Sequence, residues 1–209
     1  MEKVARKILE YIENKIPLNE EQRDYVYLGL QLILESLIEV ITILIIALIL
    51  GIFIETLVIV LVAGVFKLIS GGAHCTTFGS CYTFSIILYP LSGIIANYMI
   101  ITNYIKLHHI YILFSLIGIA CFFYAPSQIS IKPIADELRF RYKVTSLLFV
   151  MMTFIAVFIL YTRDYRVLSI SISIAMLFQA FFITPLGFYV TQVFDTLFAK
   201  LAAGKGVDP

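Results

Sequence analysis

Charged side chains are scarce in this sequence. Only 14% of its 209 residues are Asp, Glu, Lys or Arg, while 61% are hydrophobic, and the mean hydropathy is +0.97. Soluble domains contain about 25% charged and about 45–50% apolar residues. Too few polar side chains therefore remain to cover a soluble globule, and the composition predicts an integral membrane protein.

Other features are missing too, and each absence excludes a class of protein. A net charge of +1 argues against a nucleic-acid binder, which would show a concentrated basic region. Three cysteines without framework spacing do not predict a disulfide scaffold. There is neither a His-Glu-x-x-His motif nor the Cys-x-x-Cys spacing of structural zinc sites, so we predict no metal and no cofactor.

Long apolar runs are what the sequence has instead. Each run is near the roughly 20 residues needed to cross about 30 Å of hydrocarbon. We therefore predict an all-α membrane protein, a polytopic bundle of about six transmembrane helices. The runs lie at about 29–50, 52–69, 82–101, 108–125, 144–161 and 167–190.

An amphipathic helix is predicted before the first run. Residues 3–16 place Val4, Ile8 and Ile12 at helical spacing, which fits a helix lying in the membrane interface, or a surface helix packed on the membrane domain. We expect one domain over 1–209. It divides into a cytoplasmic amphipathic segment (1–28), a transmembrane bundle (29–190) and a cytoplasmic tail (191–209).

The distribution of basic residues predicts the orientation in the membrane. With the N-terminus inside, twelve of the fifteen Lys and Arg residues fall on the cytoplasmic side and three outside, as the positive-inside rule requires. Both termini and the segment 71–81 are then cytoplasmic, in a multi-pass plasma-membrane protein. Because cytosolic thiols stay reduced, Cys75 and Cys81 should be free.

The segment "GGAHCTTFGSC", residues 71–81, holds the candidate chemistry. On a straight helix His74 and Cys81 would be about 10.5 Å apart along the axis, so they can act together only if the chain bends. Gly71, Gly72 and Gly79 suit such a bend, because glycine tolerates positive φ. We expect Ser80 to cap the third span, with Cys81 in its first turn, where a helix N-terminus and an imidazolium favour a thiolate.

Several interpretations of this segment stay open on the residues alone. One is a nucleophilic site with His74 as base and Cys81 as nucleophile, for which Cys75 is a rival. Another is that the cysteines are packing residues and His74 a helix cap. A metal site of His74, Cys75 and Cys81 lacks a clear fourth ligand.

Acidic and basic residues near this segment give further candidates. Glu35 and Glu39 lie one helical turn apart in the first span. Glu35 is expected near the depth of His74, where it could orient the imidazole or pair with Lys67, and a structural or substrate-path role is preferred. The charges of the 124–143 loop either set the topology or bind an acidic peptide or anionic lipid. The basic residues of this loop are Lys132, Arg139, Arg141 and Lys143.

The residues quoted so far resemble the accessory gene regulator B family of Gram-positive quorum-sensing systems, over the whole chain. The sharpest match is Gly-Gly-x-His-x6-Cys, at Gly71, Gly72, His74 and Cys81. "YAP" at 124–126 with "KP" at 132–133 is a second match. Lys67 stands where the family often has arginine, so a bidentate carboxylate contact is lost.

This resemblance implies a membrane cysteine endopeptidase, a thiol hydrolase whose active site faces the cytoplasm. It would cut the C-terminal part from a small precursor peptide of the AgrD type and hold the remainder as a thioester on Cys81, with His74 as base. An internal thiol or hydroxyl of the peptide then closes a thiolactone or lactone, the autoinducing peptide. The family also makes a homodimer plausible.

Two features could serve this chemistry. Backbone N–H groups around Gly79 to Cys81 could form an oxyanion hole. The N-terminal helix and the loop with Lys132, Arg139, Arg141 and Lys143 would suit an amphipathic leader and an acidic tail of the precursor. The alternative function is a small-solute or peptide transporter, or a lipid-binding protein, whose His/Cys segment is structural. No internal repeat of the kind many transporters carry supports it.

Overall fold

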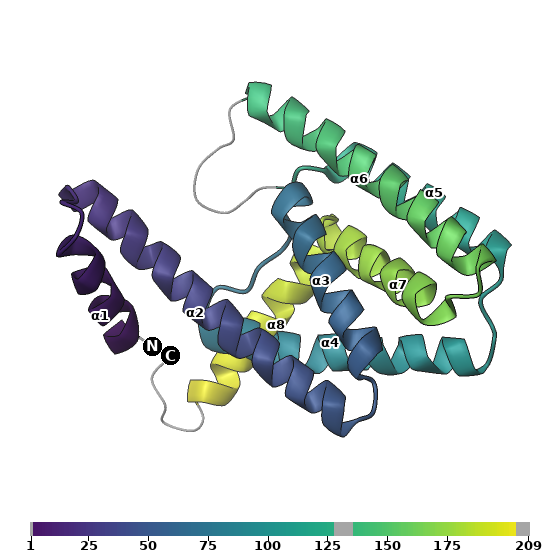
Figure 1. Ribbon diagram of the computed structural model, residues 1–209, viewed down its shortest axis with the longest axis horizontal. Coiled ribbons are helices and arrows are strands. Elements are labelled where there is room, and N and C mark those ends of the chain that lie inside the picture. The colour runs from purple at the N-terminus through teal and green to yellow at the C-terminus, as the bar shows by residue number, and fades with distance from the viewer. Residues whose placement is uncertain (1, 128–135, 204–209) are drawn as a thin grey trace.

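The computed structural model describes residues 2–127 and 136–203, and in this part of the chain all regular secondary structure is helical (Figure 1). The predicted all-α class is confirmed. The helices are α1 (Glu2–Glu13), α2 (Glu20–Ile49), α3 (Phe53–Ser70), α4 (Phe78–Ile101), α5 (Leu107–Tyr124), α6 (Asp136–Thr162), α7 (Arg166–Phe182) and α8 (Pro185–Ala203).

The number of spans agrees with the prediction of about six. Within the described residues α2 to α6 are five helices long and apolar enough to cross a membrane, and α7 with α8 makes a sixth if the pair counts as one span. The expected sixth run at 167–190 is broken, however, because α7 and α8 meet at 80°. At this bend a Cβ on Gly187 would lie 2.5 Å from the Phe181 carbonyl oxygen. Residues 191–203, expected in the tail, are helical.

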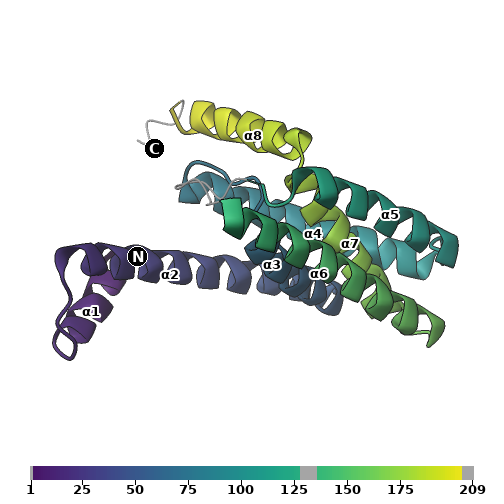
Figure 2. The ribbon, with the colours of Figure 1, turned by 90° about the horizontal axis from the view of Figure 1, so that it is seen from above.

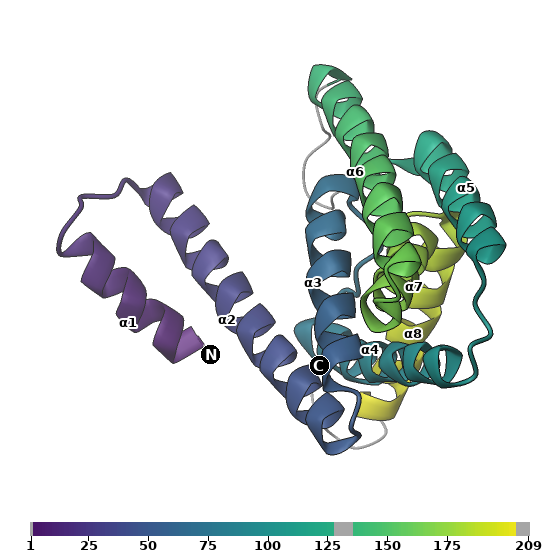
Figure 3. The same ribbon diagram turned by 45° about the vertical axis from the view of Figure 1, so that its right-hand side comes forward.

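The N-terminal helix folds back along α2. Asn19 and Gln22 form a reciprocal capping box, with bonds of 2.8 and 3.1 Å between side chain and backbone N–H, which fixes the start of α2. Ala5 and Leu9 are buried, so α1 uses its apolar face to pack on α2. Figure 3 shows α1 and the first part of α2 standing apart from the remaining helices, while the C-terminal end of α2 meets α3 and α4.

The centre of the bundle is formed by α3 and α7, which lie against each other with α4, α5 and α6 around them (Figures 1 and 2). Phe66 and Met176 are fully buried in the larger apolar cluster. Small buried residues on α7, among them Ser171 and Ala175, allow the close helix approach that is typical of membrane bundles.

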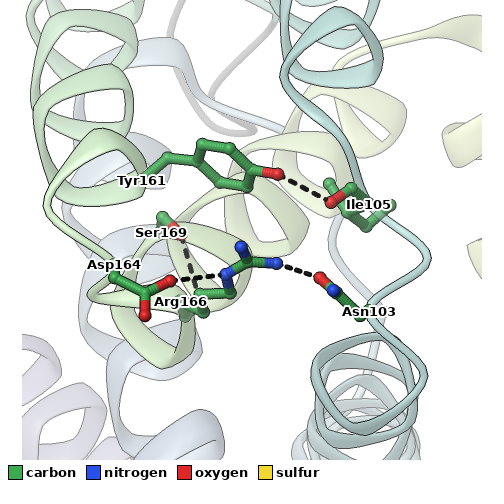
Figure 4. Close-up of polar contacts among 6 residues, drawn as sticks. All are labelled: Asn103, Ile105, Tyr161, Asp164, Arg166 and Ser169. Carbon is green, nitrogen blue, oxygen red and sulfur yellow. Dashed lines mark hydrogen bonds and ion pairs between the residues drawn. The ribbon is translucent and has the colours of Figure 1, made fainter.

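The two connections at one end of the bundle are tied together (Figure 4). Tyr161 donates a hydrogen bond of 3.0 Å to the Ile105 carbonyl, and Arg166 bonds both Asp164, at 2.8 Å, and Asn103. These contacts join the α4–α5 connection to the α6–α7 connection, at the end of α4 opposite its first turn. The first turn of α4 is where the candidate site lies.

Candidate active site

The site begins with a sharp bend between α3 and α4. Gly71 and Gly72 have φ of +70° and +148° and are buried, so the chain turns at two of the three glycines expected to allow a bend. Both precede His74, and because residues 71–77 are not helical, His74 lies off the helix that carries Cys81. Gly79 does not take part in the bend. It lies in the first turn of α4 without a positive φ, and a Cβ there would lie 3.4 Å from the Phe198 ring on α8.

Buried polar contacts hold this bend in place. The Gln179 side chain of α7 donates to the Gly71 carbonyl at 2.6 Å. Ala73 N–H donates to the Phe182 carbonyl at 2.8 Å, and Ser127 N–H to the Ser70 carbonyl at 3.0 Å. Ser127, the residue directly after "YAP", therefore lies against the end of α3.

The first turn of α4 differs in one detail from the prediction. Thr77, not Ser80, is the N-cap, and its hydroxyl accepts the Ser80 N–H at 3.2 Å. The Ser80 hydroxyl is instead directed at Asp195 of α8, at 2.5 Å. Cys81 lies in the first turn as expected, with its N–H donating to the Thr77 carbonyl at 3.0 Å. The N–H groups of Ser80 and Cys81 are thus already hydrogen-bonded. Of the three N–H groups expected to form an oxyanion hole, that of Gly79 is left.

A cavity of about 490 Å³ opens between α2, α3 and this turn. The exposed His74 imidazole and the half-buried Cys81 thiol both line it, and His74 and Cys75 lie within hydrogen-bonding reach of the Cys81 sulfur. The bend thus brings together side chains seven positions apart. The ionisable side chains lining the cavity are Glu35, Glu39, Lys67, His74, Cys75, Cys81 and Tyr89.

The three cysteines are free and have different surroundings. A hydrogen bond to the Cys81 sulfur, together with burial, raises the pKa of the Cys75 thiol above its ordinary value, so Cys75 stays a neutral thiol at pH 7 and is a poor nucleophile. Cys121 is fully buried in the larger apolar cluster, as expected of a packing residue. Cys81 is the one of the three that lies beside an imidazole.

Both acids of α2 reach the cavity, but they are not equivalent. Glu39 is within hydrogen-bonding reach of Ser85 and interacts electrostatically with Lys67 and His74. Glu35 lines the same cavity, yet in the described part of the chain it makes no ion pair with Lys67. Both acids thus line the cavity, and an electrostatic interaction with His74 is found for Glu39, one helical turn beyond Glu35.

The basic residues fall into two groups. Lys67, in the last turn of α3, lines the cavity. Arg139 and Lys143 lie at the start of α6 against the end of α5, with Lys143 Nζ 4.5 Å above the Phe122 ring, and do not reach the cavity. Arg141 is exposed on the same helix, and Lys132 lies outside the described residues.

Sequence reasoning overlooked Asp195. Its carboxylate accepts the Thr76 N–H at 2.8 Å as well as the Ser80 hydroxyl. The signal was a single charged residue in the long stretch between Arg166 and Lys200. Over residues 2–127 and 136–203, no three His, Cys, Asp or Glu side chains are arranged to hold a metal ion.

The chain is similar to known proteins over most of its length. The family model described as accessory gene regulator B matches residues 5–183. AgrB-like protein 2 of Clostridium perfringens (strain 13 / Type A) is 23% identical, and the match covers 96% of this chain and 99% of that protein. An AgrB-like protein of Clostridium perfringens (strain SM101 / Type A) is 24% identical over the same shares. No solved structure matches significantly. The chain therefore belongs to the accessory gene regulator B family, a membrane family of quorum-sensing systems that is linked to peptide processing.

Proposed function

We propose that this chain is a membrane cysteine endopeptidase that cleaves a small quorum-sensing precursor peptide of the AgrD type and cyclises the product. The observation that carries the proposal is the bend at Gly71 and Gly72, which sets the His74 imidazole beside the Cys81 thiol inside a cavity. A nucleophile with an adjacent base is the minimal arrangement for covalent acyl transfer.

The first step forms the acyl-enzyme. His74 takes the Cys81 thiol proton, and the thiolate attacks the carbonyl carbon of the scissile peptide bond. The C–N bond breaks, His74 returns the proton to the leaving amine, and the C-terminal part of the precursor departs. The remainder stays bound as a thioester on Cys81, whose place at the start of α4 puts it near the positive end of the helix dipole.

The second step closes the ring. An internal thiol or hydroxyl of the bound peptide attacks the thioester carbonyl, its proton passes through His74 to the departing Cys81 sulfur, and a thiolactone or lactone forms. Water would compete for the thioester. A half-buried thiol in a cavity between three helices favours the intramolecular attack.

The test is a covalent adduct on Cys81. Purified protein in vesicles, mixed with its precursor peptide, is expected to gain the mass of the N-terminal remainder at Cys81, as read by peptide mass spectrometry. Cys75→Ala should retain the adduct, because the Cys75 thiol stays protonated. Cys81→Ala should lose both adduct and cleavage.

Two outcomes would count against this proposal. Cleavage that survives Cys81→Ala rules out the mechanism. An adduct on Cys75 would show that Cys75, and not Cys81, is the nucleophile. A transporter with a structural His/Cys segment would instead leave the precursor uncut and move a solute across the vesicle membrane in both variants.

Substitution of the two acids separates their roles. Glu39→Gln is expected to lower the cleavage rate about tenfold or more, because an acid that interacts with His74 stabilises the imidazolium formed during acyl transfer. Glu35→Gln should change the rate less than threefold, on the order of the weak effect of a more distant charge. Steady-state cleavage kinetics measure both, and equal losses would show that the acids act together.

We also propose that the site faces the cytoplasm, as the positive-inside rule predicts. Cys81 is half-buried and Cys121 fully buried, so a small maleimide should label the 71–81 segment and spare Cys121. In intact cells a membrane-impermeant maleimide is expected to leave Cys81 unlabelled, and in inverted vesicles to label it. Labelling of Cys81 from outside intact cells would show that the orientation is the opposite of the one proposed.

A further inference from the structure

Helix α8 packs on the first turn of α4, although it lies beyond residues 5–183, the part of the chain that the family model matches. The rings of Phe84 and Phe194 are 4.8 Å apart, and the Phe198 ring lies over Gly79. The 80° bend after α7 directs α8 to this position (Figures 1 and 2). The C-terminal helix is thus packed against the turn that carries the nucleophile.

One carboxylate on α8 joins both sides of the segment between His74 and Cys81. Asp195 Oδ2 accepts the Thr76 N–H at 2.8 Å, and Asp195 Oδ1 accepts the Ser80 hydroxyl at 2.5 Å. Thr76 is two residues after His74, and Ser80, which is 1% exposed, directly precedes Cys81. Hydrogen bonds to an ionised acceptor are about twice as strong as neutral ones.

His74 therefore lies between two anchors. On one side Ala73 N–H is bonded to the Phe182 carbonyl, and on the other Thr76 N–H is bonded to Asp195. The His74 side chain is itself exposed. Its position is set by the backbone on either side, and Asp195 supplies one of those two constraints.

We propose that Asp195 is a positioning residue that holds His74 and Cys81 in register, and that α8 is part of the catalytic unit. Asp195 does not line the cavity, so it acts through Thr76 and Ser80 and not on the peptide. The inference rests on the proposed function for its kinetic consequence. The arrangement of the thiol and the imidazole can be measured without any substrate.

The first measurement is the rate at which iodoacetamide alkylates Cys81 at pH 7, resolved from the other cysteines by peptide mass spectrometry. In Asp195→Ala the rate is expected to fall about tenfold, the factor that follows from losing a hydrogen bond to a charged group. Ser80→Ala should give a smaller loss, because it removes only one of the two contacts that Asp195→Ala removes. The double variant should therefore lose no more than Asp195→Ala alone. Gln192→Ala, at an exposed position of the same helix, should match the wild type.

The second measurement is precursor cleavage by Asp195→Ala. Its kcat should fall with KM unchanged, because the wall of the cavity stays intact. An alkylation rate that stays at the wild-type value, or rises, in Asp195→Ala overturns the proposal. If Asp195→Ala fails to fold, the near-isosteric Asp195→Asn is used together with Ser80→Ala. A wild-type alkylation rate in these variants overturns the proposal in the same way. Wild-type protein that is alkylated but never cleaves a precursor contradicts the proposed function, while the alkylation comparison still decides the role of Asp195.

Discussion

Replacement of His74 by alanine is expected to lower the rate of acyl-enzyme formation by roughly 10²–10⁴-fold, the usual contribution of a positioned general base. His74 is the imidazole within reach of the Cys81 sulfur, so no other histidine can take its place. Single-turnover mixing with the precursor, followed by mass spectrometry of the Cys81 peptide, measures the rate directly. The fold should be little affected, because the side chain is exposed.

Exposure of His74 also allows chemical rescue. Added imidazole can enter the space left in His74→Ala, and it should restore part of the rate in proportion to its concentration. His108→Ala is the matched control, since His108 is also exposed but lies in the first turn of α5, at the other end of the bundle. A His74→Ala rate within tenfold of wild type, or equal losses in both variants, would contradict the assignment of the base.

Replacement of Gly72 by alanine is expected to destabilise the fold by roughly 1–3 kcal/mol, the range for a residue held in a sparsely populated backbone conformation. Gly72 has a φ of +148°, and a Cβ there would lie 3.0 Å from Gln179 Nε2. Gln179 is the side chain that holds the Gly71 carbonyl. The substitution therefore strains the backbone and displaces the contact that secures the bend.

Thermal unfolding in detergent measures this effect, with an expected drop in the midpoint of about 2–4 °C per kcal/mol for a chain of this size. Gly118→Ala is the matched control. Gly118 lies in α5 with open space where a Cβ would project, and alanine favours a helix over glycine by about 1 kcal/mol. Its midpoint should stay or rise. If the unfolding midpoint of Gly72→Ala equals that of Gly118→Ala, neither the positive φ of Gly72 nor its contact with Gln179 limits the residue at this position.

Much of the fold could be predicted because it depends on local pattern. Apolar runs of span length predicted the helices α2 to α6. The failure came at 167–190, which reads as one continuous apolar run. The break there depends on contacts at Gly187 with the preceding turn, and hydropathy does not register such contacts.

The site was predicted in part for the same reason. His74 and Cys81 stand out by residue type, and the geometry of a straight helix already required the bend between them. From the sequence Glu35 was the candidate because it was expected near the depth of His74, whereas in the structure both Glu35 and Glu39 line the cavity. Thr77, and not Ser80 as expected, is the N-cap of α4, because the Ser80 hydroxyl is hydrogen-bonded to Asp195.

By itself the sequence determined the membrane character, the all-α class and the family, and it indicated the residues that we propose carry the chemistry, because composition, periodicity and motif are properties of neighbouring residues. Only the tertiary structure decided that both acids of α2 line the cavity of His74 and Cys81, and that Asp195 binds this segment from 119 residues away. Each of these depends on contacts between helices distant in the chain. Hydrogen bonds of that kind act over about 3 Å, and no spacing along the chain reports them.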